Sequence, residues 1–148
     1  MNIKEQLESA LKDAMRANDD VKRRTLRMAL SSIKLAEIEK GKPLDDLSMM
    51  AILHKEIKSR NEAIQEARTA HRSDLENEAL AEISVLEPFL PKPLTDSELQ
   101  EVVKSVMMEI NGASPSDMGR IIKLVMERVQ GRAANDRISQ VVRSLIQK

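Results

Sequence analysis

The sequence predicts an all-α protein with an N-terminal bundle of about four helices and a small C-terminal three-helix bundle. Apolar residues recur at helical spacing along nearly all 148 residues, and no stretch alternates as a half-buried strand does. Phe89 is the single aromatic residue. The cores must therefore be aliphatic, whereas strands are enriched in aromatic and β-branched side chains. Three prolines within residues 88–93 divide the pattern, because proline interrupts a helix.

The N-terminal domain, residues 1–90, is expected to contain four helices. Segments of helical period cover residues 3–17, 20–40, 47–70 and 73–87. Asp19 or Asp20 is placed to cap the second helix, and Gly41 to end it. Ser73 with Glu76 has the spacing of a capping box that opens the fourth helix.

The C-terminal domain, residues 91–148, is expected to contain three helices. Thr95 and Glu98 form a second capping-box pattern, flanked by Leu94 and Leu99 at the positions of a hydrophobic staple. Ser114 is placed to cap the middle helix, with proline at its first position. Gly131 is expected to end that helix, and the apolar stripe of the last helix begins at Ile138.

The composition gives no sign of an active site. The absence of cysteine excludes disulfides, thiolate metal sites and cysteine nucleophiles. His54 and His71 lie near different ends of one predicted helix, so they cannot share a metal ion, and no metal or cofactor is predicted. The four glycines are isolated and form no phosphate-binding loop. We predict no catalytic residue, although an enzyme with an unrecognised site stays an alternative.

The sequence also bears on the cellular compartment. The first residues carry charges every few positions, unlike a signal peptide. No stretch approaches the roughly 20 apolar residues that a membrane span needs. We therefore expect a cytoplasmic protein with no membrane contact.

The second predicted helix carries a basic ridge. At 100° per residue, Arg23, Arg27 and Lys34 fall within roughly 40° of one another, with Arg24 further round the polar side. Guanidinium groups at this spacing can meet successive phosphates. The alternative is a solvated basic face that pairs with the acidic helix 74–87.

The third predicted helix has two features of interest. His54 and Lys58 belong to a polar ridge that can donate hydrogen bonds to sugar and phosphate oxygens, although an ordinary exposed face looks the same. Arg60 projects instead on the apolar side. A buried guanidinium needs a carboxylate partner, and Glu82 is the first candidate for a structural ion pair.

The C-terminal domain offers a further basic cluster, formed by Arg120, Lys123 and Arg132. Gly119 is expected within a helix, where glycine is unfavourable, so we expect it to permit the close approach of another backbone. Packing between helices of the bundle is the alternative interpretation of this region.

Ordered motifs along the chain resemble those of the GatB/YqeY family. They are Lys-Glu-Ile-Lys-Ser-Arg-Asn-Glu-Ala (55–63), Phe-Leu-Pro-Lys (89–92), Pro-Leu-Thr-Asp-Ser-Glu-Leu (93–99), Asp-Met-Gly-Arg (117–120) and Gly-Arg-Ala (131–133). The resemblance covers essentially the whole chain and fits a stand-alone YqeY-like protein. One departure is Ala134, where the family usually has aspartate, so Asn135 or Asp136 would have to cap the last helix.

The resemblance implies two helical domains and a non-catalytic role. Similar modules form the tail of the B subunit of tRNA-dependent amidotransferases and are appended to some glutaminyl-tRNA synthetases, where they help to hold tRNA. The first hypothesis is therefore a tRNA-binding accessory module that works alone or with synthetase or amidotransferase components. The alternative is an adaptor for such a complex, with a partner docked on exposed apolar residues such as Met49 and Met50.

Overall fold

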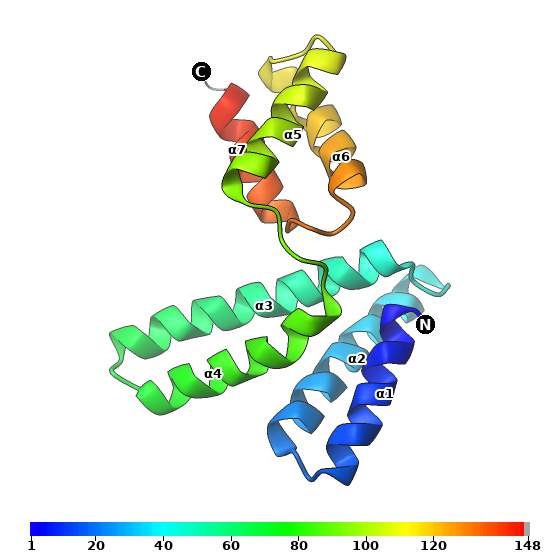
Figure 1. Ribbon diagram of the computed structural model, residues 1–148, viewed down its shortest axis with the longest axis vertical. Coiled ribbons are helices and arrows are strands. Elements are labelled where there is room, and N and C mark those ends of the chain that lie inside the picture. Colours follow the sequence, from blue (N-terminus) through cyan, green and yellow to red (C-terminus); the bar gives the residue numbers. More distant parts are fainter. Residues whose placement is uncertain (147–148) are drawn as a thin grey trace. The chain divides into compact units, whose positions relative to one another are not determined.

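The computed structural model describes residues 1–146, which form seven α-helices and two short 3-10 helices and contain no strand (Figure 1). The predicted all-α class is confirmed. The elements are α1 (Ile3–Arg16), α2 (Asp20–Lys40), α3 (Asp46–Thr69), α4 (Ser73–Leu86), η1 (Glu87–Phe89), α5 (Asp96–Glu109), η2 (Pro115–Asp117), α6 (Met118–Val129) and α7 (Asn135–Ile146). The chain divides into two compact units, Met1–Leu90 and Pro91–Lys148.

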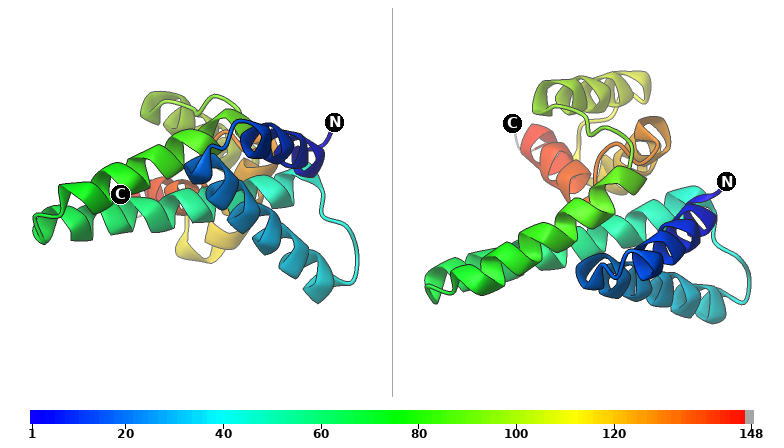
Figure 2. Two further views of the ribbon diagram at one scale, coloured as in Figure 1. Left: turned by 90° about the horizontal axis from the view of Figure 1, so that it is seen from below. Right: turned by 60° about the horizontal axis from the view of Figure 1, so that its bottom comes forward.

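The N-terminal unit consists of two helical hairpins. Helix α1 packs against α2, α3 packs against α4, and α2 contacts both helices of the second hairpin (Figures 1 and 2). All four helices contribute to one aliphatic core, whose largest fully buried side chains are Leu7, Leu26, Ile33, Met49, Leu53 and Leu86. A smaller cluster of Ile64, Ala79 and Ile83 joins α3 to α4.

Side-chain caps begin three of these four helices. Asn2, Asp19 and Asp45 each accept a hydrogen bond from a backbone N–H in the first turn. The capping box expected at Ser73 does not form: Ser73 is the first residue of α4, and no side chain caps this helix. The carboxylate of Glu76 instead accepts a hydrogen bond from Arg68 of α3, so a tertiary contact has replaced the local one.

Helix α2 ends as the sequence indicates. Gly41 has φ 72°, the left-handed conformation that glycine adopts readily, and its N–H bonds to the carbonyls of the last helical turn.

The C-terminal unit is a three-helix bundle in which each helix contacts the other two (Figure 2). Thr95 and Glu98 form both hydrogen bonds of the predicted capping box. Leu94 and Leu99 of the predicted staple are both buried in the same core. That core is aliphatic throughout, and its fully buried members are Leu99, Val103, Val106, Ile121, Val125, Ile138 and Val142.

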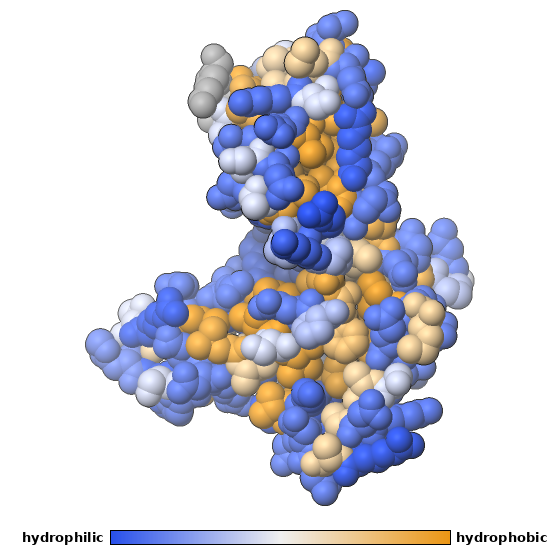
Figure 3. All heavy atoms as spheres, viewed as in Figure 1, coloured by the Kyte–Doolittle hydropathy of each residue, from blue (hydrophilic) through white to orange (hydrophobic). Residues whose placement is uncertain are grey.

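Two methionines expected at the surface lie elsewhere. Met49 is 1% exposed within the core, and Met50 is half-buried against it. Figure 3 shows that hydrophilic residues dominate the drawn face, with apolar patches between the helices. Exposed large apolar side chains occur on several helices, and those on α2 include Leu35 and Ile38.

Candidate functional site

The N-terminal half of α2 borders an open groove of about 650 Å³. Three of the four basic residues predicted on this helix line the groove together. Their neighbours on the same face supply two hydroxyl groups, a thioether and one carboxylate. The lining residues are Asp20, Arg23, Arg24, Arg27, Met28, Ser31 and Ser32.

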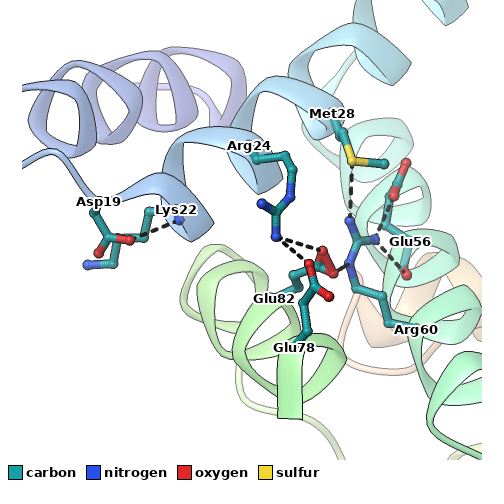
Figure 4. Close-up of polar contacts among 8 residues, drawn as sticks. All are labelled: Asp19, Lys22, Arg24, Met28, Glu56, Arg60, Glu78 and Glu82. Atoms are coloured by element: carbon teal, nitrogen blue, oxygen red, sulfur yellow. Dashed lines mark hydrogen bonds and ion pairs between the residues drawn. The ribbon is translucent and has the colours of Figure 1, made fainter. Parts of the chain in front are cut away.

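The arginines of the groove differ in their ionic partners. Nη2 of Arg23 donates to Oδ1 of Asp20 at 2.6 Å, one turn earlier on α2. Nη2 of Arg24 donates to Oε1 of Glu78 on α4 at 2.8 Å (Figure 4). Arg27 is exposed and forms no ion pair within residues 1–146. The predicted alternative, pairing with the acidic helix, therefore describes Arg24 but not Arg27.

Lys34 continues the ridge but lines a different groove. This second groove has a volume of about 730 Å³ and lies between α1, the C-terminal half of α2 and the loop that follows. Lys34 is exposed and, in the described part of the chain, has no ion-pair partner. Its neighbour Glu37 is engaged by Lys4 at 2.8 Å. The structure thus groups three cations at one groove and places the fourth beyond it.

The α3 candidates lie outside both grooves. His54 is half-buried and Lys58 is exposed, and each already interacts with other groups of the protein.

Arg60 is held in a buried charge network beneath the basic ridge. It is 7% exposed. Its Nη1 donates to Oε2 of Glu56 at 2.8 Å, and its Nε lies 3.4 Å from Oε2 of Glu82 (Figure 4). Its Nη2 also reaches the sulfur of Met28 at 3.9 Å. The network therefore ties α3 to both α2 and α4.

Sequence reasoning missed Glu56, the nearer partner of Arg60. Its spacing, four residues before the arginine on the same helix, is that of a favourable ion pair and could have revealed it. Glu56 also accepts a hydrogen bond from the hydroxyl of Ser32 at 2.8 Å, so it reaches α2 as well. The acceptor of Arg24, Glu78, could not be found in this way because it is 54 residues distant in the sequence.

The C-terminal cations do not play equivalent roles. Arg120 and Lys123 are exposed on α6 and make no ion pair with the residues that the structure describes. Arg132 donates from Nε to the carbonyl of Lys92 at 2.9 Å, and its own carbonyl accepts the N–H of Leu94 at 2.9 Å. Arg132 therefore fastens the loop after α6 to the segment before α5.

Two glycine predictions are corrected by the structure. A Cβ built on Gly119 meets no described atom within 4 Å, so no backbone packs closely against this exposed glycine. Gly112 is the crowded one, because a Cβ there would lie 2.7 Å from a carboxylate oxygen of Asp117. Gly131 has φ 81°, but the left-handed conformation already begins at Gln130, one residue before the predicted end.

The described residues form neither a metal-binding cluster nor a membrane-spanning helix. Within residues 1–146, no three His, Asp or Glu side chains are grouped as metal ligands. None of the described helices combines the length and the apolar character required to cross a membrane.

The fold and site define an all-α protein of two helical units whose candidate interface consists of exposed cations on helix faces. The family model for YqeY-like proteins matches residues 4–146. The chain therefore belongs to the YqeY-like family, and the resemblance found in its motifs is confirmed.

Fungal proteins named "Altered inheritance of mitochondria protein 41, mitochondrial" are similar in sequence. The protein of Lachancea thermotolerans is 34% identical over 74% of this chain and 60% of its own length. That of Pyrenophora tritici-repentis is 31% identical over 87% of this chain and 72% of its own. That of Saccharomyces cerevisiae is 34% identical over 63% of this chain and 51% of its own. The chain thus spans only part of the length of these relatives.

These relatives contradict the predicted cytoplasmic localisation, since their names place them in mitochondria. The prediction was wrong because its two arguments, first residues unlike a signal peptide and the lack of a membrane span, do not distinguish the cytoplasm from the interior of an organelle. The names state no catalytic activity.

Proposed function

We propose that this YqeY-like protein is an RNA-binding accessory module that holds tRNA-like RNA by its phosphates and performs no catalysis of its own. The observation that carries the proposal is the groove on α2, which is lined by three arginines and two serines. The guanidinium group of arginine and the hydroxyl group of serine are among the groups with which proteins commonly contact phosphate and sugar oxygens.

The internal carboxylates do not prevent such binding. The pair between Arg23 and Asp20 is exposed, and exposed ion pairs contribute only about 0–1 kcal/mol. Arg27 has no carboxylate to displace among residues 1–146. The net charge of the chain is zero, so attraction must come from this local surface rather than from the whole protein.

The same surface argues against recognition of unpaired bases. Phe89 is the single aromatic residue of the sequence, and it is half-buried against the core of the N-terminal unit. Without a stacking platform, binding depends on phosphates and shape, is sensitive to salt and discriminates little between sequences. By resemblance, a synthetase or amidotransferase would be the enzyme that uses the bound RNA.

The test is a fluorescence-anisotropy titration with labelled tRNA at several salt concentrations. Reversal of Arg23 and Arg27 to glutamate should lower the affinity and flatten the plot of log K against log salt. The slope should fall by roughly 0.7–0.9 for each phosphate that the variant no longer neutralises. Reversal of Arg120 and Lys123 tests the exposed cations of α6 separately.

The matched control uses Lys12 and Arg16, which are exposed on α1 with the same four-residue spacing. Their reversal changes the net charge equally but should leave the salt slope unaltered. Absence of tRNA binding by the wild-type protein at low salt, or an equal response of both double variants, would refute the proposal.

An adaptor function is the second candidate, favoured by the exposed apolar side chains of α2. Leu35 is 59% exposed and Ile38 is 68% exposed. Residues of this kind commonly mark a contact with another protein when they cluster. If a purified partner binds the wild type and Leu35→Asp abolishes that binding while tRNA does not bind, the adaptor function replaces the first proposal.

A further inference from the structure

One of the arginines that line the groove already forms an ion pair with a carboxylate from another helix. Arg24 lines the groove on α2, but its guanidinium turns toward α4, where Nη2 meets Oε1 of Glu78 at 2.8 Å (Figure 4). Glu78 lies outside the groove, and Arg24 is its only ion-pair partner in the described part of the chain. The guanidinium is therefore held away from the cations beside it.

We propose that Glu78 occupies the anion position of Arg24 in place of an RNA phosphate, and that the two exchange when RNA enters the groove. This inference rests on the proposed function. It makes Glu78 a determinant of which anions the groove accepts. A ligand must offer several linked phosphates, because engagement of Arg23 and Arg27 has to accompany displacement of the carboxylate from Arg24.

The exposure of the pair permits this exchange. The side chains of Arg24 and Glu78 are 47% and 49% exposed, and an ion pair in water contributes little to stability. A phosphodiester group offers the same fork of oxygens that a guanidinium binds in a carboxylate. Breaking the ion pair would therefore cost the fold little and return Arg24 to the groove.

A second carboxylate close to Arg24 cannot serve the same purpose. Oε1 of Glu82 lies 3.8 Å from Nη2 of Arg24, but the other oxygen of Glu82 faces Arg60 at 3.4 Å. The Glu82 side chain is 15% exposed and belongs to the buried network. Removal of Glu78 thus leaves Arg24 with only the longer contact to Glu82 and leaves no buried cation unpaired.

The experiment compares Glu78→Gln with Glu76→Gln in the tRNA titration. Glu76 is the matched control because it lies on the same helix, pairs with Arg68 and carries the same charge. We expect Glu78→Gln to tighten binding roughly two- to fivefold, the range that corresponds to removal of an exposed ion pair. The salt slope should stay unaltered, since after the exchange Arg24 neutralises the same phosphate in the wild type. Glu76→Gln should leave both the affinity and the salt slope unaltered.

A third variant shows whether the gain acts through Arg24. In Arg24→Gln/Glu78→Gln the tighter binding should disappear, and the salt slope should fall by roughly 0.7–0.9 because no guanidinium then neutralises that phosphate. A gain that persists without Arg24, or one that Glu76→Gln reproduces, would overturn the exchange and leave only a general charge effect. Thermal melts of all variants establish that the fold is retained.

Failure of this inference differs from failure of the proposed function. If wild-type binding depends on Arg23 and Arg27 but Glu78→Gln has no effect, only the exchange is refuted. If neither the wild type nor any variant binds tRNA at low salt, both are refuted.

Discussion

Nη1 of Arg60 donates a hydrogen bond of 2.8 Å to the carboxylate of Glu56, one turn earlier on α3, at a site where the arginine is only 7% exposed. The pair lies where the two hairpins of the N-terminal unit meet, and Glu82 approaches it from α4. A cation at this depth is tolerated because two carboxylates and a backbone carbonyl surround it.

Arg60→Ala should lower the free energy of unfolding by about 3 kcal/mol. This is the lower end of the range for breaking a buried pair, since the carboxylates of Glu56 and Glu82 stay partly hydrated, at 20% and 15% exposure. Urea denaturation followed by circular dichroism measures the loss. Arg16→Ala is the control and should change stability by less than about 0.5 kcal/mol, because Arg16 is 81% exposed with its partner 3.9 Å distant. Equal losses in both variants would contradict this account.

Thr95→Ala should destabilise α5 by about 1 kcal/mol, whereas Ser73→Ala should have almost no effect on α4. The hydroxyl of Thr95 accepts the N–H of Glu98 at 3.1 Å, while no side chain caps α4. Amide hydrogen exchange in the first turns of the two helices reports each effect separately. Similar protection losses at both sites would mean that the capping hydrogen bond contributes nothing.

The two capping boxes show how far local patterns predict this fold. Both have the right residues at the right spacing, but only Glu98 folds back onto its own helix. Glu76 finds Arg68, which lies on the neighbouring helix once α3 and α4 have packed. Hydrophobic periodicity predicted all seven helices, because each amphipathic stripe is a local property. The choice between a local and a tertiary partner depends on packing that the sequence does not display.

The candidate site also combines local features, which the sequence predicts, with tertiary contacts, which it does not. Helical geometry predicted that Arg23 and Arg27 share a face, and both line the α2 groove. It could not show that Arg24 turns toward Glu78, since that contact depends on the approach of α4. The prediction that Met49 is exposed was wrong for a similar reason. Neighbouring helices cover the face of α3 on which Met49 lies, and the sequence does not show this packing.

Gly119→Ala should stabilise the C-terminal unit by about 0.5–1 kcal/mol, because alanine loses less entropy than glycine in a helix and this position is open. Gly41→Ala should instead destabilise the N-terminal unit by about 1 kcal/mol, since alanine disfavours the φ of 72° found there. Thermal denaturation of both variants should shift in opposite directions. A loss of stability in Gly119→Ala would show that the glycine has a packing partner after all.

Glu37 fastens three segments of the N-terminal unit and should make its stability depend on pH. One carboxylate oxygen accepts a hydrogen bond from Nζ of Lys4 on α1 at 2.8 Å, and the other accepts the N–H of Leu44 at 3.1 Å. The hydrogen bond from Lys4, followed by that from Leu44, lowers the pKa of Glu37 below its ordinary value of 4.5. A carboxyl group that binds protons less readily in the folded state stabilises that state above its unfolded pKa. The stabilisation is lost as the pH falls from 4.5 through the lower pKa of the folded protein.

Glu37→Gln should therefore lower the melting temperature at pH 7, and the difference from wild type should shrink toward pH 3. Glutamine keeps a carbonyl that can accept the Leu44 N–H but loses the charge that attracts Lys4, so the variant isolates the ionic part. Glu39→Gln is the control, because the side chain of Glu39 is exposed and makes no hydrogen bond or ion pair within residues 1–146. Its melting temperature should follow the wild type at every pH. If the melting temperature of Glu37→Gln is lower than that of the wild type by the same amount at pH 3 and pH 7, the prediction is wrong. The carboxylate would then stabilise the fold by packing alone, and its ionisation, favoured by Lys4 and Leu44, would contribute nothing.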